Sequence, residues 1–379
     1  MGSVFPSVET WQTRGGDIVL VGAKRAPVYD LARIAARIEE EPYRSALRVA
    51  WRSSGVQGFL GRYLAGDQLA RAIGSAPRVQ INTDDRNIVE FGFARSLGRD
   101  YQMVSQIRSL AQGVGATRPP VEGGPVDWSA VDMAWVSQIA AEGGVIQINP
   151  QASPEHRIRQ RALIHYYRED NLEAARAVWA QQSSPAADQN EIAMVAEIQA
   201  TAGAPEAVTT IERLRHFHAG EADVMLAELR FAQRDYEGTA AALETAFATF
   251  RRDPWALPRF TQKGVARAQV LGSAQPMFAR RMIEALREPF AVKVADIRRR
   301  VAIAFLTSQV DFKGMCADAI GALEPNVPWA EDFLALRRNC YAETGDLRLA
   351  AATRELGEYL SMEGLPLNAG VAIRNGALR

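Results

Sequence analysis

The chain has 379 residues, 47% hydrophobic and 23% charged, which is ordinary for globular proteins and enough for two or three domains. Its 44 Lys and Arg residues balance its 44 Asp and Glu residues, so no overall field attracts nucleic acid or an anionic membrane. No apolar run reaches the ~18–20 residues that span a bilayer, and the N-terminus lacks a signal-peptide pattern. The two cysteines, Cys316 and Cys340, predict buried thiols in a reducing, cytoplasmic compartment.

The N-terminus predicts a β-hairpin. Strand-like runs extend from Val4 to Trp11 and from Asp17 to Gly22, with Gly15 and Gly16 at the turn. The second run is apolar at every position from Ile18 to Val21, which is typical of a strand buried on both faces inside a sheet. An isolated hairpin is marginal in water, so we expect a partner or a longer parent chain to supply the rest of the sheet.

The next hundred residues predict mixed structure. Residues 28–73 have helical apolar periodicity, residues 79–94 alternate like strands around a polar loop, and residues 101–112 indicate a short helix. In that loop, Asp84 and Asp85 are adjacent carboxylates, which either cap the loop or bind a cation or amine. We take Thr83, Asp84, Asp85 and Glu90 as candidate substrate-binding residues that close over a basic substrate.

A glycine- and proline-rich segment, 113–126, predicts a linker, and the chain after it is helical in pattern. Residues 128–148 indicate a further helix pair or a cap. The sequence thus divides into a first domain at 1–112, the linker, a helical-repeat domain at 127–365 and a tail at 366–379.

The helical part has a repeat. Similar phrases begin after a turn at Asn171, Ala204, Asp235, Gln275, Asp311 and Asp346, spaced by 31 to 40 residues. A period in the mid-thirties with two helices per unit is typical of a tetratricopeptide (TPR)-like α-solenoid, whose units bury their apolar faces only against neighbours. The alternative is an irregular all-α bundle.

Few other residues predict chemistry. No glycine-rich phosphate loop or nucleophile elbow is present. His216 and His218 are two residues apart, so we expect a helix-surface pair rather than metal ligands. The run from Arg298 to Arg300 is either a solvated helix face or a small anion site. We assign no catalytic, cofactor-binding or metal-binding residue.

Two motifs carry a family resemblance. The runs SVFPSVETWQT and GDIVLVGAK resemble the last two strands of a spermidine-synthase-like domain, found in bacterial polyamine aminopropyltransferase homologues that continue into helical repeats. INTDDRNIVEFGFAR, from Ile81 to Arg95, resembles the closing motif of that family, which often has proline where this chain has Asn87.

The resemblance implies a mainly α fold in which an N-terminal α/β remnant precedes a TPR-like solenoid. The remnant would be the last strands of a methyltransferase-like Rossmann sheet, with the seventh strand antiparallel beside the fifth. The family binds decarboxylated S-adenosylmethionine at loops after its early strands. This chain contains none of those loops, so the resemblance implies no cofactor and no activity for the chain alone.

Three hypotheses follow. The chain is the C-terminal portion of a spermidine-synthase-like protein, or a free-standing repeat protein that binds a protein or peptide, or a polyamine binder. Under the first, the partner includes the catalytic domain, and the DNA upstream of Met1 should extend the reading frame by a domain's length, ~150 residues. Under all three we expect a soluble protein without nucleic-acid partners.

Overall fold

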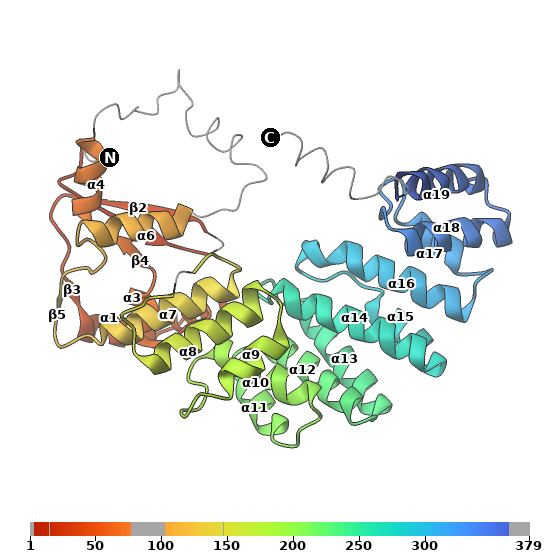
Figure 1. Ribbon diagram of the computed structural model, residues 1–379, viewed down its shortest axis with the longest axis horizontal. Coiled ribbons are helices and arrows are strands. Elements are labelled where there is room, and N and C mark those ends of the chain that lie inside the picture. The colour runs from red at the N-terminus through yellow and green to blue at the C-terminus, as the bar shows by residue number, and fades with distance from the viewer. Residues whose placement is uncertain (1–3, 15, 77–102, 147, 364–379) are drawn as a thin grey trace, which may run out of the picture. The chain divides into compact units, whose positions relative to one another are not determined.

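The computed structural model describes residues 4–14, 16–76, 103–146 and 148–363 (Figure 1). The described chain is mainly helical with two small sheets, which confirms the mainly α expectation. It divides into two compact units, Met1–Ile198 and Gln199–Arg379. The predicted linker, 113–126, lies within the first unit, and the predicted domain limits stay a prediction because compactness does not establish independent folding.

A three-stranded antiparallel sheet forms the N-terminal part of the first unit. Its strands are β1 (Ser7–Gln12), β2 (Ile18–Ala23) and β4 (Tyr63–Ala65), in the order β2-β1-β4. The predicted hairpin is confirmed, and its turn is closed by Thr13, whose backbone N–H donates to the Asp17 carbonyl at 2.9 Å. β1 is central and almost wholly buried.

β2 is not buried on both faces, contrary to the sequence expectation. It lies at the edge of the sheet, and Val19, Leu20 and Val21 are 45%, 46% and 40% exposed. The reason is that no described element covers the strand on its outer side. β2 therefore has the composition of an internal strand in the position of an edge strand.

Helices make up most of the rest of the first unit. They are α1 (Leu31–Ile38), α2 (Tyr43–Ser45), the π-helical η1 (Ala46–Ala50), α3 (Gly55–Leu60), α4 (Asp67–Gly74), α6 (Met103–Gly113), α7 (Trp128–Ala141), α8 (Pro154–Leu163), the π-helical η2 (Ile164–Arg168) and α9 (Leu172–Trp179). A second sheet pairs β3 (Tyr29–Asp30) with β5 (Val121–Glu122) in parallel.

Three local predictions in this unit were tested. The helix predicted at 101–112 is confirmed by α6. Tyr63 and Leu64, predicted to be helical, instead form β4, because Arg62 places its carbonyl within 2.8 Å of the Gln12 N–H and so joins the β1 ladder. The segment 128–148 contributes α7 alone rather than a helix pair in its described residues.

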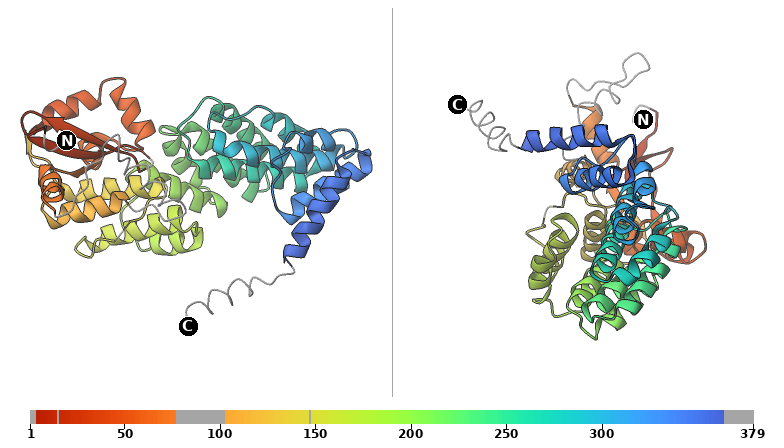
Figure 2. Two further views of the ribbon diagram at one scale, coloured as in Figure 1. Left: turned by 90° about the horizontal axis from the view of Figure 1, so that it is seen from above. Right: turned by 90° about the vertical axis from the view of Figure 1, so that its right-hand side faces the viewer.

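The second unit is a series of helices, seen side by side in Figure 2. After α10 (Gln189–Thr201), which crosses the division, they are α11 (Ala207–Arg215), α12 (Ala219–Ala232), α13 (Tyr236–Phe250), α14 (Pro258–Ala274), η3 (Pro276–Phe278), α15 (Ala279–Leu286), η4 (Lys293–Ala295), α16 (Asp296–Val310), α17 (Cys316–Gly321), α18 (Glu331–Thr344) and α19 (Leu349–Glu363).

The packing in this unit is between near neighbours. From α11 to α19, each α-helix packs against the next one in sequence, and α12, α14, α16 and α18 also contact one another in series. Small residues allow the close approach: a Cβ on Gly264 of α14 would lie 3.2 Å from the Phe247 ring of α13.

Several predicted helix starts coincide with caps. Asn171 accepts a hydrogen bond from the Ala174 N–H at the start of α9, and Asp235 accepts one from the Gly238 N–H at the start of α13, both at 2.9 Å. Such side chains satisfy backbone donors that a helix leaves unpaired in its first turn.

We expect Asp235→Ala to lower the free energy of unfolding of the second unit by about 1 kcal/mol, because the α13 cap is lost. Asp235→Asn keeps a capping oxygen and is the matched control, with a loss of a few tenths of a kcal/mol. Thermal unfolding followed by circular dichroism measures both. An equal loss in both variants would show that charge, not capping, is responsible.

Two sequence predictions, each for a charged or polar residue of the second unit, were wrong. Arg299 is not part of a solvated face: it is buried and donates to the Leu286 and Arg287 carbonyls at 2.6 and 2.8 Å. It thereby pairs carbonyls at the C-terminal end of α15, which a helix leaves unsatisfied. His218, the N-cap residue of α12, is also buried rather than on the surface.

The two cysteines are buried free thiols, as predicted. Cys316 of α17 and Cys340 of α18 belong to one apolar cluster. Burial raises the pKa of the Cys316 thiol, and Cys340 adds to the increase. Both features favour the protonated, unreactive form.

Candidate functional site

The substrate-binding residues predicted from sequence, Thr83, Asp84, Asp85 and Glu90, lie outside the described residues. Their assignment stays a prediction. Among the residues that the structure describes, no three His, Cys, Asp or Glu side chains converge as metal ligands. His216 is exposed, and its Nδ1 lies 2.8 Å from the Glu212 carbonyl within its own helix.

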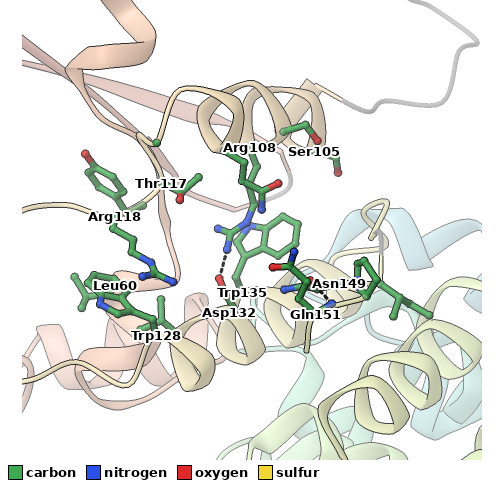
Figure 3. A pocket seen from close by; sticks show the side chains of 17 residues that line it. Leu60, Ser105, Arg108, Thr117, Arg118, Trp128, Asp132, Trp135, Asn149 and Gln151 are labelled. Atoms are coloured by element: carbon green, nitrogen blue, oxygen red, sulfur yellow. Dashed lines mark hydrogen bonds and ion pairs between the residues drawn. The ribbon is translucent and has the colours of Figure 1, made fainter. Parts of the chain in front are cut away.

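The first unit contains an open cavity of about 700 Å³ between α6, α7 and the loop at 148–151 (Figure 3). No sequence pattern predicted this cavity, because its lining comes from segments far apart in the chain. Polar side chains dominate, among them Ser105, Thr117, Asn149 and Gln151. Its wall includes two arginines, each placed over a tryptophan.

Arg108 is the buried cation of this cavity. Its guanidinium lies 4.2 Å from the centre of the Trp135 ring and donates to Asp132 at 2.5 Å, and Figure 3 shows this pair facing each other. Burial lowers the pKa of Arg108, while Asp132 opposes that change. Because the carboxylate offsets the charge, Arg108 does not provide a free cation to the cavity.

Arg118 is the second cation of the cavity. It is exposed, lies 5.1 Å from the centre of the Trp128 ring, and has no ionic partner among the described residues. The cavity can therefore hold a small polar or anionic molecule by hydrogen bonds. Its described lining pairs no nucleophile with a general base, so the geometry indicates binding rather than catalysis.

One serine–histidine pair lies outside this cavity. Ser129 Oγ is 2.9 Å from His156 Nδ1, with both side chains exposed. In a nucleophilic dyad the second imidazole nitrogen is held by a third group, and none is present in the described part of the chain. The pair is a helix-surface contact.

A buried carboxylate that sequence reasoning missed lies in the sheet. Glu9 of β1 accepts hydrogen bonds from Tyr29 Oη at 2.5 Å and from Trp11 Nε1 at 3.3 Å. Burial and the Glu9 carboxylate raise the pKa of Tyr29. Aromatic rings surround the site: Trp11 contacts Tyr29, Phe59 and Tyr63 with ring centres 5.1 to 5.6 Å apart. The only sequence signal was an acidic residue inside a strand.

A pair of carboxylates, the half-buried Asp188 and the buried Glu191, lies at the start of α10. Arg159 of α8 donates to Glu191 at 2.5 Å, and Ser137 donates to Asp188 at 2.9 Å. Burial raises the pKa of Asp188. Burial and the Asp188 charge raise the pKa of Glu191 to about 7, despite the arginine. The positive charge of Arg159 is therefore shared between the two carboxylates.

This raised pKa predicts a pH dependence. The native state binds the Glu191 proton more tightly than the unfolded state, so its contribution to stability is present at low pH and is lost as pH rises through about 7. Between pH 5 and 8, we expect wild type to lose on the order of 1–3 kcal/mol relative to Glu191→Gln. Urea unfolding at both pH values measures this, and parallel pH profiles would contradict it.

Comparisons with known proteins add no relative: no protein family, curated protein or solved structure matches this chain. The fold and the cavity therefore define it only as a mainly helical protein with two small sheets and a polar cavity. In its described part, none of the helices combines the length and apolar character needed to cross a membrane.

Proposed function

We propose that the chain is the non-catalytic, C-terminal portion of a spermidine-synthase-like protein, whose parent transfers aminopropyl groups in polyamine biosynthesis. In this proposal β1 and β2 are the last two strands of a methyltransferase-like sheet. The second unit is a TPR-like solenoid that binds a protein or peptide. Decarboxylated S-adenosylmethionine is a cosubstrate of the parent only.

The observation that carries this proposal is that β2 is an apolar strand at the edge of its sheet. The strand is apolar from Ile18 to Val21, antiparallel to β1, and free of any strand on its outer side in the described residues. The resemblance places the fifth strand of the family at that position. An internal strand with one missing neighbour accounts for both its composition and its exposure.

A second apolar surface on the same unit supports the proposal. A groove of about 380 Å³ is lined almost entirely by apolar side chains of α1, α2, η1 and α3, including Ile34, Leu47, Trp51 and Phe59. Phe59 also contacts Trp11 of β1, so the groove and the sheet share one aromatic cluster. Further layers of a larger α/β domain would cover such a surface.

The near-neighbour packing of α11–α19 supports the solenoid. In a solenoid, each repeat contacts only the repeats beside it, and equivalent helices of successive repeats stack in a row. The series α12, α14, α16 and α18 is such a row. This packing equally favours the alternative function, a free-standing protein-interaction scaffold with no catalytic activity.

The size of the protein in its own cells separates these two functions. An antibody raised against the second unit should detect a species larger than 41.5 kDa, because the parent chain carries an additional domain of ~150 or more residues. A single species at 41.5 kDa would contradict the proposal and leave the scaffold.

Polyamine binding by Thr83, Asp84, Asp85 and Glu90 is a separate proposal, and calorimetry can test it. Spermidine should release or absorb heat with the intact protein and give none with Asp85→Asn, because a carboxylate that holds an amine is lost. Absence of heat with the intact protein would exclude this proposal.

A further inference from the structure

One face of α7 forms part of the wall of the polar cavity in the first unit. Trp128, Asp132 and Trp135 follow one another at intervals of four and three residues, which places them side by side along the helix. Arg118 lies over the first tryptophan, and Arg108 lies over the second. Asp132 bonds to Arg108 (Figure 3). Two guanidinium groups and one carboxylate therefore meet on this face.

The described lining of the cavity has an excess of positive charge. Its charged side chains are Arg108, Arg118 and Asp132, and two positive charges with one negative charge leave a net charge of +1. Arg108 and Asp132 offset each other as an ion pair. The excess therefore belongs to Arg118, which has no ionic partner in the described part of the chain. An anion with a single negative charge would balance it.

The hydrogen-bonding groups of Arg118 are available to such an anion. Its one contact among the described residues is with the ring of Trp128, 5.1 Å away from centre to centre. An indole offers no acceptor, so this contact leaves the N–H groups of the guanidinium unused. A guanidinium can donate two parallel hydrogen bonds to the two oxygens of one carboxylate. Arg118 is thus equipped to bind a carboxylate in this two-point manner.

Neutral hydrogen-bonding side chains make up the rest of the polar lining. Thr117 is half-buried beside Arg118, and Asn149 lies on the loop at 148–151. The Oδ1 of Asn149 accepts a hydrogen bond from the Gln151 N–H at 2.9 Å, so its amide N–H groups remain as donors. Hydroxyl and amide groups of this kind recognise the hydroxyl groups of a ligand.

We propose that this cavity binds a small hydroxylated carboxylate, of the chemical class of the sugar acids. A carboxylate matches the net charge of +1, whereas a phosphate monoester carries about −1.5 to −2 at pH 7. The volume of about 700 Å³ is in the range of small-molecule sites, about 300–1,000 Å³. The proposed function gives this cavity no role, so a ligand here is an additional property of the chain.

Isothermal titration calorimetry of the intact chain with gluconate tests this proposal. Gluconate should bind, and glucose should bind about tenfold more weakly or worse, because it has the hydroxyl groups without the carboxylate. Equal affinity for glucose would overturn the role of the charge. Tighter binding of glucose 6-phosphate than of gluconate would overturn the assignment to a carboxylate.

Substitutions of Arg118 test the site itself. Arg118→Met should weaken gluconate binding about tenfold or more, and Arg118→Lys should recover only part of this loss, because lysine keeps the charge without the two-point geometry. Because Arg118 is exposed, both variants should keep the wild-type circular dichroism spectrum. Arg33→Met, at an exposed arginine of α1 outside the cavity, is the matched control and should leave the affinity unchanged.

Two results would overturn the inference. One is the absence of gluconate binding by the intact chain. The other is an affinity of Arg118→Met equal to that of the wild type. The length of the native protein, which the antibody experiment measures, is independent of both results.

Discussion

Arg62→Met should lower the free energy of unfolding of the first unit by about 3–5 kcal/mol, because it removes the cation that faces the buried carboxylate of Glu142. Arg62 is completely buried. It pairs with Glu142 at 2.7 Å and donates to the carbonyls of Thr13 at 2.6 Å and Trp51 at 3.0 Å. One side chain thus connects the hairpin turn, η1 and the end of α7.

Hydrogen exchange read by mass spectrometry measures this effect in each unit separately, since exchange reports the free energy of local and global opening. Peptides from β1 and α7 should lose protection, and peptides from α13 should keep it. Arg71→Met is the matched control: Arg71 is 74% exposed, so its ion pair with Asp67 contributes at most about 1 kcal/mol. Arg62→Met/Glu142→Leu should recover part of the loss. An effect of Arg62→Met no larger than that of Arg71→Met would contradict the prediction.

Phe247→Ala should destabilise the second unit by about 3–5 kcal/mol, because truncation of a buried phenylalanine leaves a cavity. Phe247 of α13 is fully buried, and its ring centre lies 5.5 Å from that of Phe290, beyond α15. The ring also packs on Gly264 of α14. The side chain therefore joins α13, α14 and the loop that follows α15.

Phe247→Leu is the matched control, since it keeps most of the volume and should cost less than about 1.5 kcal/mol. The same exchange measurement should show faster exchange in α13 and α14 of Phe247→Ala and unchanged exchange in β1. Equal losses of stability in the two variants would contradict the prediction. They would show that neighbouring side chains fill the space beside Phe290 without a cost in free energy.

The helical pattern of the chain after residue 127 was predictable because its determinants are local. Asn171 and Asp235 cap the helices that follow them, and short side-chain interactions of that kind are visible in sequence. Arg299 was misjudged because its partners, the Leu286 and Arg287 carbonyls, belong to another helix. A run of three arginines contains no information on which member is buried.

The sheet and the cavity illustrate the same limit. Alternation in residues 4–22 predicted the hairpin, but β4 depends on pairing with a strand more than fifty residues away. Apolar composition alone could not show that β2 has one neighbouring strand in the part of the chain that the structure describes. The cavity walls also come from distant segments, so Arg108 and Trp135 gave no joint signal in the sequence.

Buried contacts in the first unit join residues far apart in the sequence, which affects how the chain folds during synthesis on the ribosome. Arg52 donates to Asn190 at 2.8 Å within the buried interior, a separation of 138 residues. Because translation proceeds from the N-terminus, Arg52 must wait for most of the unit to emerge before this contact can form. The second unit can instead condense helix by helix as it emerges, since its contacts join near neighbours. The exposed hairpin is therefore most vulnerable to mispairing while its own unit is still incomplete.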